Sequence, residues 1–251
     1  MKVYYLIILL IFITLRLHAQ KDLTVNIELY EHALNAPSLD IYEITEYFRT
    51  ASNVDSELIE MSYYWICDNI EYDVELSRKS HLTDEDVSVE STIKSGKAIC
   101  SGYSKLLCEF AFYLDIECAE INGIGQNYLD PKMDSIEMNH AWNAVLVDSN
   151  WKLIDATWGA GGVSGRSNEY VKNLDMRYFF ADPEFLLIDH LPQDSTWQMR
   201  DNPISYSEFW NEHWSEMRFR KFNNLLDEDK YQRHLEMMKR EPIKIDEDGY
   251  R

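Results

Sequence analysis

One stretch with helical periodicity begins at a cysteine, and it constrains this chain more than any other feature. From Cys100 the sequence reads CSGYSKLLCEFAFYLD, in which apolar residues recur at three- and four-residue spacing. A helix is predicted from Cys100, or just after it, to about Leu114. The thiol would lie at a helix N-terminus, where N–H groups and the positive end of the dipole favour a thiolate. Gly102 would leave room for close approach to the backbone and is a candidate substrate-binding residue.

Two later segments, HAWNAVLV and WKLIDATW, are predicted to form the strands of a β-hairpin. The polar residues 148–150 between them have the composition of a turn. A loop of two or four residues would place His140 and Asp155 on one face as diagonal neighbours, whereas a three-residue loop would place them on opposite faces. Trp142 shares the face of His140 and is the second candidate substrate-binding residue.

Cys100, His140 and Asp155 have the chemical types of a catalytic triad. A thiolate attacks, an imidazole exchanges protons near neutral pH, and a carboxylate holds the imidazole in one tautomer. Each residue alone has an ordinary structural explanation, such as a buried core cysteine or a hydrogen-bonded strand histidine. The three together predict a thiol-dependent acyl-transfer enzyme.

The same segments resemble the transglutaminase-like superfamily of papain-type folds. The resemblance is carried by AICSGYSKLLCEFAFYLDIECAEINGIG around the cysteine and NHAWNAVLVDSNWKLIDATWGAG around the histidine. Upstream, MSYYWICDNIEYD is similar to the helix that leads into this core in bacterial members. Downstream, RYFFADPEFLLIDHLPQDSTWQ is similar to a segment of the kyphoscoliosis-peptidase branch. The resemblance covers residues 55–198.

This resemblance implies an α+β, papain-like core with N-terminal helices packed on an antiparallel sheet and the nucleophile at a helix N-terminus. Cys100 would be the nucleophile, His140 the base and Asp155 the residue that orients the base. A backbone N–H at Cys100 would help to hold the oxyanion. The expected reaction is hydrolysis of peptide or amide bonds in a protein or peptide substrate. Protein cross-linking and a catalytically silent binding scaffold are the alternatives.

The N-terminal residues have the composition of a secretory signal peptide. Lys2 precedes a 13-residue run, residues 3–15, that is apolar except for one threonine, and a small residue, Ala19, precedes Gln20. Thirteen residues are too few to cross about 30 Å of hydrocarbon as a helix. We expect cleavage after Ala19 and export to the periplasm or the extracellular space, with an uncleaved membrane anchor as the alternative.

A single catalytic domain is expected between the predicted signal peptide and a C-terminal extension. The predicted ranges are 1–19 for the signal peptide, 20–54 for a lead-in and helix, 55–200 for the catalytic core and 201–251 for a helical extension and tail. The formal net charge of −20 disfavours binding to nucleic acid or to anionic lipid. Neither the clustered Cys/His spacing of a metal site nor a phosphate-binding loop is present, so no metal or cofactor is expected. The sequence leaves the oligomeric state open.

The other cysteines and the remaining segments carry weaker signals. Cys67, Cys108 and Cys118 are expected to be core thiols, although Cys118 could form a disulfide with either of the other two. The remaining predictions are a lead-in with weak alternation at 20–37, helices opening at Asp40 and spanning 55–70, a polar surface loop at 78–95, a strand at 118–124, a flexible loop at 159–162 and helix over 207–238.

Overall fold

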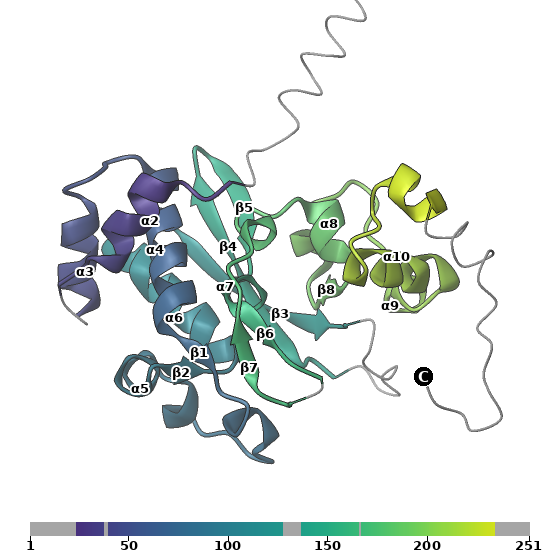
Figure 1. The fold of residues 1–251 in the computed structure, drawn as a ribbon, viewed down its shortest axis with the longest axis horizontal. Coiled ribbons are helices and arrows are strands. Elements are labelled where there is room, and N and C mark those ends of the chain that lie inside the picture. The colour runs from purple at the N-terminus through teal and green to yellow at the C-terminus, as the bar shows by residue number, and fades with distance from the viewer. Residues whose placement is uncertain (1–23, 38–39, 128–136, 166, 234–251) are drawn as a thin grey trace, which may run out of the picture. The chain divides into compact units, whose positions relative to one another are not determined.

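The structure is a computed structural model that describes residues 24–37, 40–127, 137–165 and 167–233 (Figure 1). The chain divides into two compact units: unit 1 comprises 1–120 and 142–181, and unit 2 comprises 121–141 and 182–251. The predicted signal peptide and the end of the predicted C-terminal tail lie outside the described residues. Within the described ranges, no helix combines the length and the apolar character needed to cross a membrane.

Unit 1 contains most of the described helices. Its α-helices in the described ranges are α2 (Ile27–Leu34), α3 (Ile41–Phe48), α4 (Asp55–Asn69), α5 (Val89–Ser95), α6 (Cys100–Tyr113) and α7 (Ala156–Ala160). Its short 3₁₀ helices are Leu76–Arg78, Glu85–Val87 and Met176–Tyr178. Its strands are β1 (Glu71–Tyr72), β2 (Lys97–Ala98), β5 (Asn150–Ile154), β6 (Gly161–Val163) and β7 (Tyr170–Lys172).

Strands β3 (Cys118–Gly125) and β4 (His140–Val147) have residues in both units. The elements of unit 2 are α8 (Pro183–Leu187), β8 (His190–Pro192), a 3₁₀ helix (Ser195–Gln198), α9 (Tyr206–Phe209) and α10 (Glu212–Phe222). The strand order β5-β4-β3-β8 makes a four-stranded sheet in which the β4–β5 and β3–β8 pairs are antiparallel. This mixture of helices and an antiparallel sheet confirms the predicted α+β class.

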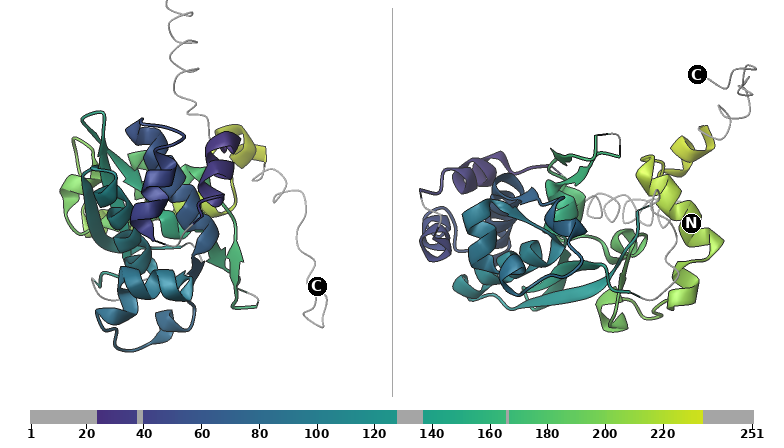
Figure 2. Two further views of the ribbon diagram at one scale, coloured as in Figure 1. Left: turned by 90° about the vertical axis from the view of Figure 1, so that its left-hand side faces the viewer. Right: turned by 90° about the horizontal axis from the view of Figure 1, so that it is seen from below.

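Helix α4 forms the centre of the unit 1 core, packed against α2, α6 and α7. The purple and blue helices of this group lie side by side in all views (Figure 1 and Figure 2). Leu58, Ile59 and Tyr63 on α4 are almost fully buried, and Trp65 packs in the same core. The helix has the predicted length, but Val54 rather than Asp55 is its N-cap residue. Asp55 instead lies in the first turn, where its charge is favourable to the helix dipole.

The β4–β5 hairpin confirms the even loop that the catalytic prediction required. The register runs from Asn143 opposite Ile154 to Val147 opposite Asn150, so the loop consists of two residues. Both loop residues have positive φ, 50° and 61°, as a type I′ turn requires. The predicted strand was too long, however. β5 ends at Ile154, and Asp155 is the N-cap residue of helix α7 instead of pairing within the hairpin.

Two segments in which no helix was predicted contain short helices. The lead-in at 20–37 contains α2, capped by the Asn26 side chain, and the loop at 78–95 contains α5, capped by Ser88. In each helix the capping side chain accepts a hydrogen bond from the backbone N–H three residues later. A single capping residue is only a weak indication of a helix when the helix is this short. The predicted loop at 78–95 was therefore wrong where α5 lies, and helix α2 was not predicted within the lead-in.

The glycine-rich segment at 159–162 is part of α7 and β6 rather than a flexible loop. A Cβ atom at Gly159 would overlap the hydroxyl of Tyr63. That hydroxyl donates a hydrogen bond of 2.7 Å to the carbonyl of Asp175, so it is held in place. The glycine at 159 serves close packing between α7 and α4.

Unit 2 has its own small hydrophobic core around α9 and α10. Phe209 is fully buried there, in contact with a set of apolar residues that includes Ile124, Leu187, Leu191 and Trp214. The predicted helix over 207–238 is broken, since α9 ends at Phe209 and α10 begins at Glu212. Phe209 and Trp210 both pack in this core of unit 2. The segment beyond residue 233 lies outside the described residues.

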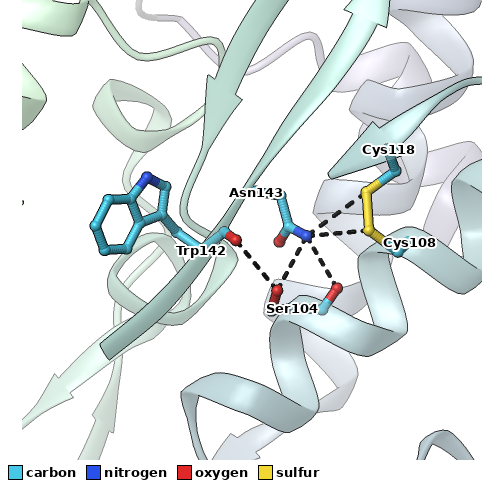
Figure 3. The surroundings of a disulfide bond; sticks show 5 residues. All are labelled: Ser104, Cys108, Cys118, Trp142 and Asn143. Atoms are coloured by element: carbon cyan, nitrogen blue, oxygen red, sulfur yellow. Dashed lines mark hydrogen bonds between the residues drawn. A yellow bond between two sulfur atoms is a disulfide. The ribbon is translucent and has the colours of Figure 1, made fainter. Parts of the chain in front are cut away.

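A disulfide joins the second half of α6 to the start of β3 (Figure 3). Cys108 and Cys118 are bonded across ten residues of sequence, with their Cα atoms 5.3 Å apart. The preference for three core thiols was wrong for this pair, while Cys67 is a buried thiol outside the disulfide. The Asn143 amide from β4 points at both sulfur atoms and donates to the Ser104 carbonyl at 3.0 Å.

Removing this disulfide should lower the free energy of unfolding by about 2–3 kcal/mol, because the unfolded chain regains the freedom of the closed loop. The variant Cys108→Ser/Cys118→Ser and wild type treated with a reductant should show the same loss in urea denaturation. Reductant should leave the double variant unchanged. Equal stability of wild type and the double variant would contradict the prediction.

Candidate active site

Cys100 is the first residue of α6, as predicted. Strand β2, just before it, pairs in parallel with β1, where Tyr72 is opposite Ala98 and Asp73 N donates to Ala98 O at 2.8 Å. Of the four cysteines, two form the disulfide and Cys67 is buried, whereas Cys100 is partly exposed and forms no disulfide. Cys100 is thus the one thiol placed both at a helix start and within reach of solvent.

The first turns of α6 are fixed by packing and hydrogen bonds. A Cβ atom at Gly102 would lie 2.8 Å from Ala98 Cβ and 2.9 Å from Thr92 Oγ1, so the glycine lets α6 approach the preceding segment. Tyr103 donates its hydroxyl to Ile70 O at 2.6 Å. The structure accordingly gives Gly102 a packing role, and its substrate-binding role stays a prediction.

Trp142, the other predicted substrate-binding residue, is buried. Its side chain is only 2% exposed, and its carbonyl accepts a hydrogen bond of 3.2 Å from Ser104 Oγ on α6. Figure 3 shows the indole on the opposite side of β4 from Asn143 and the disulfide. The indole therefore contributes to the protein interior, and its proposed contact with substrate stays a prediction.

Tyr72 is a neighbour of the thiol that sequence reasoning did not identify. Burial raises the pKa of the Tyr72 hydroxyl, and the charge of a Cys100 thiolate raises it further. The phenol is therefore protonated at neutral pH. In the sequence, Tyr72 belongs only to a Glu-Tyr dipeptide after α4, which does not by itself indicate a site.

Asp155 is fully buried at the junction between β5 and α7. Its Oδ1 atom accepts hydrogen bonds from Thr157 N at 2.8 Å and Trp158 N at 3.1 Å, and its own N–H donates to Tyr178 O at 3.0 Å. These bonds hold the carboxylate in one orientation. Both of these capping bonds are made to the same oxygen, Oδ1.

His140 begins β4 and is 8% exposed. The preceding Asn139 fixes the start of this strand, since its side chain accepts from Gly125 N at 2.8 Å and donates to Gly125 O at 3.0 Å. A Cβ atom at Gly125 would lie 3.0 Å from both Cβ and Cγ of His140. The imidazole therefore packs directly on the backbone of β3.

A second histidine, His190, contacts the ring of His140 within unit 2. The ring centroids are 5.1 Å apart with an interplanar angle of 61°, and one ring nitrogen of each lies within 4.8 Å of the other. At this spacing two imidazoles could share a hydrogen-bonded water or a metal ion. His190 was assigned no role in the sequence, where it was one of several scattered histidines.

The structure assigns the predicted site residues to both units. Cys100, Gly102, Trp142 and Asp155 belong to unit 1, and His140 belongs to unit 2. The joint action of Cys100, His140 and Asp155 in catalysis stays a prediction.

Comparison with known proteins identifies the domain. Residues 42–156 match the model of the transglutaminase-like superfamily. Kyphoscoliosis peptidase of Mus musculus is 30% identical over 159 residues, which cover 62% of this chain and 24% of that protein. The Homo sapiens kyphoscoliosis peptidase is 27% identical over 187 residues, covering 74% and 28%. The Lim and transglutaminase domain protein ltd-1 of Caenorhabditis elegans is 24% identical over 194 residues, covering 71% and 26%. The chain thus spans about a quarter of the length of the relatives it matches.

Two solved structures are also similar to the chain. One is a TGase, with a TM-score of 0.38 and 15% identity, covering 67% of this chain and 42% of that one. The other is a putative cysteine protease from Cytophaga hutchinsonii, with a TM-score of 0.33 and 18% identity, covering 61% and 49%. The family resemblance predicted from the sequence segments is confirmed by the model match and the relatives. This chain therefore carries a transglutaminase-like domain at residues 42–156.

Proposed function

We propose that this chain is an exported, thiol-dependent acyl-transfer enzyme that hydrolyses peptide or amide bonds. The observation that carries the proposal is the setting of Cys100, a partly exposed thiol that opens a helix inside the segment matching the family. A helix N-terminus favours the thiolate over the thiol, and the thiolate is the nucleophile.

In the proposed reaction, the Cys100 thiolate attacks the carbonyl carbon of a peptide or amide bond. The negative charge that develops on the carbonyl oxygen is held by the backbone N–H of Cys100. Protonated His140 gives its proton to the leaving amine as the C–N bond breaks, which leaves a thioester on Cys100. His140 then takes a proton from water, the hydroxide adds to the thioester, and the carboxylic acid leaves as the thiolate returns.

Asp155 has the role of orienting the base in this proposal. A buried carboxylate that is already fixed by two backbone N–H groups can accept an N–H of His140 without losing further freedom. The Asp155 carboxylate thereby selects one tautomer of His140, in which the second ring nitrogen exchanges a proton with the thiol. The carboxylate also stabilises the imidazolium.

Proteins or peptides are the proposed substrates, as is fitting for a transglutaminase-like domain. Export is supported by the composition of the N-terminal residues and by the Cys108–Cys118 disulfide, since disulfides persist in oxidising compartments. Replacing water by an amine in the second step would convert the same site into a cross-linking enzyme. A domain with an unreactive thiol would be a binding scaffold.

Alkylation of Cys100 by iodoacetamide tests this function. We expect labelling with an apparent pKa well below about 8.5, the value of an ordinary cysteine. His140→Ala should move the profile to higher pH, because the imidazolium that stabilises the thiolate is lost. Cys100→Ser should abolish labelling at acidic pH, as followed by peptide mass spectrometry.

The buried thiol provides the matched control for this experiment. Cys67→Ser should leave the labelling profile of the protein unchanged, because Cys67 is enclosed in the core and burial raises its pKa. A Cys100 profile centred at or above pH 8.5 in wild type, or one that His140→Ala does not move, would contradict a catalytic triad and favour the scaffold.

A further inference from the structure

A series of charged and aromatic side chains in unit 2 leads from α10 to His140. Lys221 on α10 binds both carboxylate oxygens of Asp189, at 2.9 Å and 2.8 Å. The same carboxylate lies 2.6 Å from Nδ1 of His190, and the His190 ring meets His140 edge to face. All four side chains are buried.

The protonation of this series follows from its contacts. Although burial raises the pKa of Asp189, its pairs with Lys221 and His190 hold the pKa below the ordinary value of a carboxyl group. An ionised carboxylate only accepts hydrogen bonds, so Nδ1 of His190 is the donor. In the neutral ring this leaves Nε2 as the acceptor nitrogen, on the side of the imidazole away from Asp189. Arg218, the other buried cation of α10, donates to the carbonyls of Ile188 and Phe209 at 3.2 Å and 3.0 Å.

The sheet explains why His190 reaches His140. Gly125 on β3 is the cross-strand partner of His190 on β8. Because Gly125 has no side chain, the imidazole of His140 occupies the space above it, 3.0 Å from where a Cβ atom would be. The ring of His190, opposite the glycine, then bounds that space from the side. The His140 ring is therefore confined by a backbone on one side and by a fixed ring on another.

We propose that His190 is a positioning residue for the base, with the Lys221–Asp189 pair fixing His190 so that its ring holds His140 against Gly125. This inference rests on the proposed function, in which His140 exchanges protons with Cys100. His190 touches neither substrate nor thiol in this role and acts through His140. A misplacement of about 1 Å in a catalytic group can cost about 10²-fold in rate, so confinement of this ring has consequences for catalysis.

The inference also gives a function to the predicted C-terminal extension. Lys221 lies beyond residue 200, where the predicted catalytic core ended, yet unit 2 joins residues on both sides of that boundary. The extension would then contribute the buried cation on which the orientation of His190 depends.

His190→Asn separates the ring contact from the rest of the structure. Asparagine places its amide nitrogen near the position of Nδ1, so the hydrogen bond to Asp189 is kept while the ring atoms beside His140 are removed. We expect iodoacetamide labelling of Cys100 at pH 6 to fall roughly tenfold, with the pH profile moving toward that of His140→Ala. The matched control, His213→Asn, changes an exposed histidine of the same unit and should leave the profile unchanged.

The outcomes distinguish this inference from the proposed function. A His190→Asn profile equal to wild type, beside a shifted His140→Ala profile, would overturn the positioning role and leave the triad standing. An unshifted His140→Ala profile would overturn both. If a chelator reproduces the loss in wild type, the two histidines hold a metal ion, and the positioning role is overturned.

A second variant keeps the test decisive if His190→Asn does not fold. Asp189→Asn/Lys221→Met removes both charges that fix His190 and leaves the ring itself in place. The pH profile of a folded double variant should move in the same direction as expected for His190→Asn. A profile equal to wild type in this variant would overturn the role of the ion pair.

Discussion

Replacing Asp155 with asparagine should lower turnover by about 10⁴-fold and leave the chain folded. The Oδ1 atom of asparagine can still accept from Thr157 N and Trp158 N, so the cap of α7 is kept. The amide that replaces the second oxygen donates instead of accepting, which favours the wrong tautomer of His140 in the proposed triad. Loss of activity without loss of the cap would therefore be specific to catalysis.

Hydrolysis of a diverse peptide library, followed by mass spectrometry, measures this effect even though the substrate is unidentified. Asp182→Asn is the matched control, because Asp182 caps α8 with bonds of 2.9 Å and 3.1 Å to two backbone N–H groups. It should keep full activity. Turnover in Asp155→Asn equal to that of the Asp182→Asn control would remove Asp155 from the mechanism, whatever its role in the fold.

Local patterns were sufficient to predict the two elements that carry the proposed nucleophile and base. The start of α6 at Cys100 followed from apolar periodicity, and the hairpin followed from two alternating segments around a short polar turn. The loop length, and with it the register, was left open by the sequence. Both signals are contained within about 15 residues, so no distant contact was needed to interpret them.

The end of β5 shows where local pattern was misleading. Ala156, Thr157 and Trp158 are compatible with a strand by composition, yet the side chain of Asp155 caps a short helix there. The residue type alone does not distinguish an aspartate that caps a helix from an aspartate that belongs to a triad. The two roles differ in the backbone conformation of the residues that follow. A five-residue helix such as α7 is too short to show helical periodicity in its sequence.

The contacts around His190 could not be predicted for a different reason. Asp189 and Lys221 are separated by 32 residues, and strand β8, a 3₁₀ helix and helix α9 lie between them. Charged residues on a helix such as α10 are usually solvated, so its sequence favoured an exposed face. Which lysine enters the interior depends on the tertiary packing of α10 against α8 and β8, which no local pattern encodes.

Replacing Lys221 with methionine should lower the free energy of unfolding by about 3–5 kcal/mol, because it leaves the Asp189 carboxylate buried without its cation. Methionine retains much of the aliphatic chain that lies over the Phe185 ring, where Lys221 Nζ is 3.7 Å from the centroid. The loss would thus come mainly from the charge. Urea denaturation at neutral pH measures it. Lys172→Met, which breaks a largely exposed pair with Asp68, should cost only about 0–1 kcal/mol.

The pH dependence identifies Asp189 as the source of this loss. The pKa of Asp189 in the folded protein is below its ordinary value, so its contribution to stability is present above about pH 3.9 and is lost as pH falls through the folded value. In Lys221→Met the carboxyl group can become neutral by protonation, so the deficit relative to wild type should narrow as the solution is acidified from pH 7 toward pH 4. Adding Asp189→Asn should recover most of the stability at pH 7, because no buried charge then remains unpaired. If that double variant is as unstable as Lys221→Met alone, the lysine stabilises the unit through packing, and the ion pair is not what holds His190 in place.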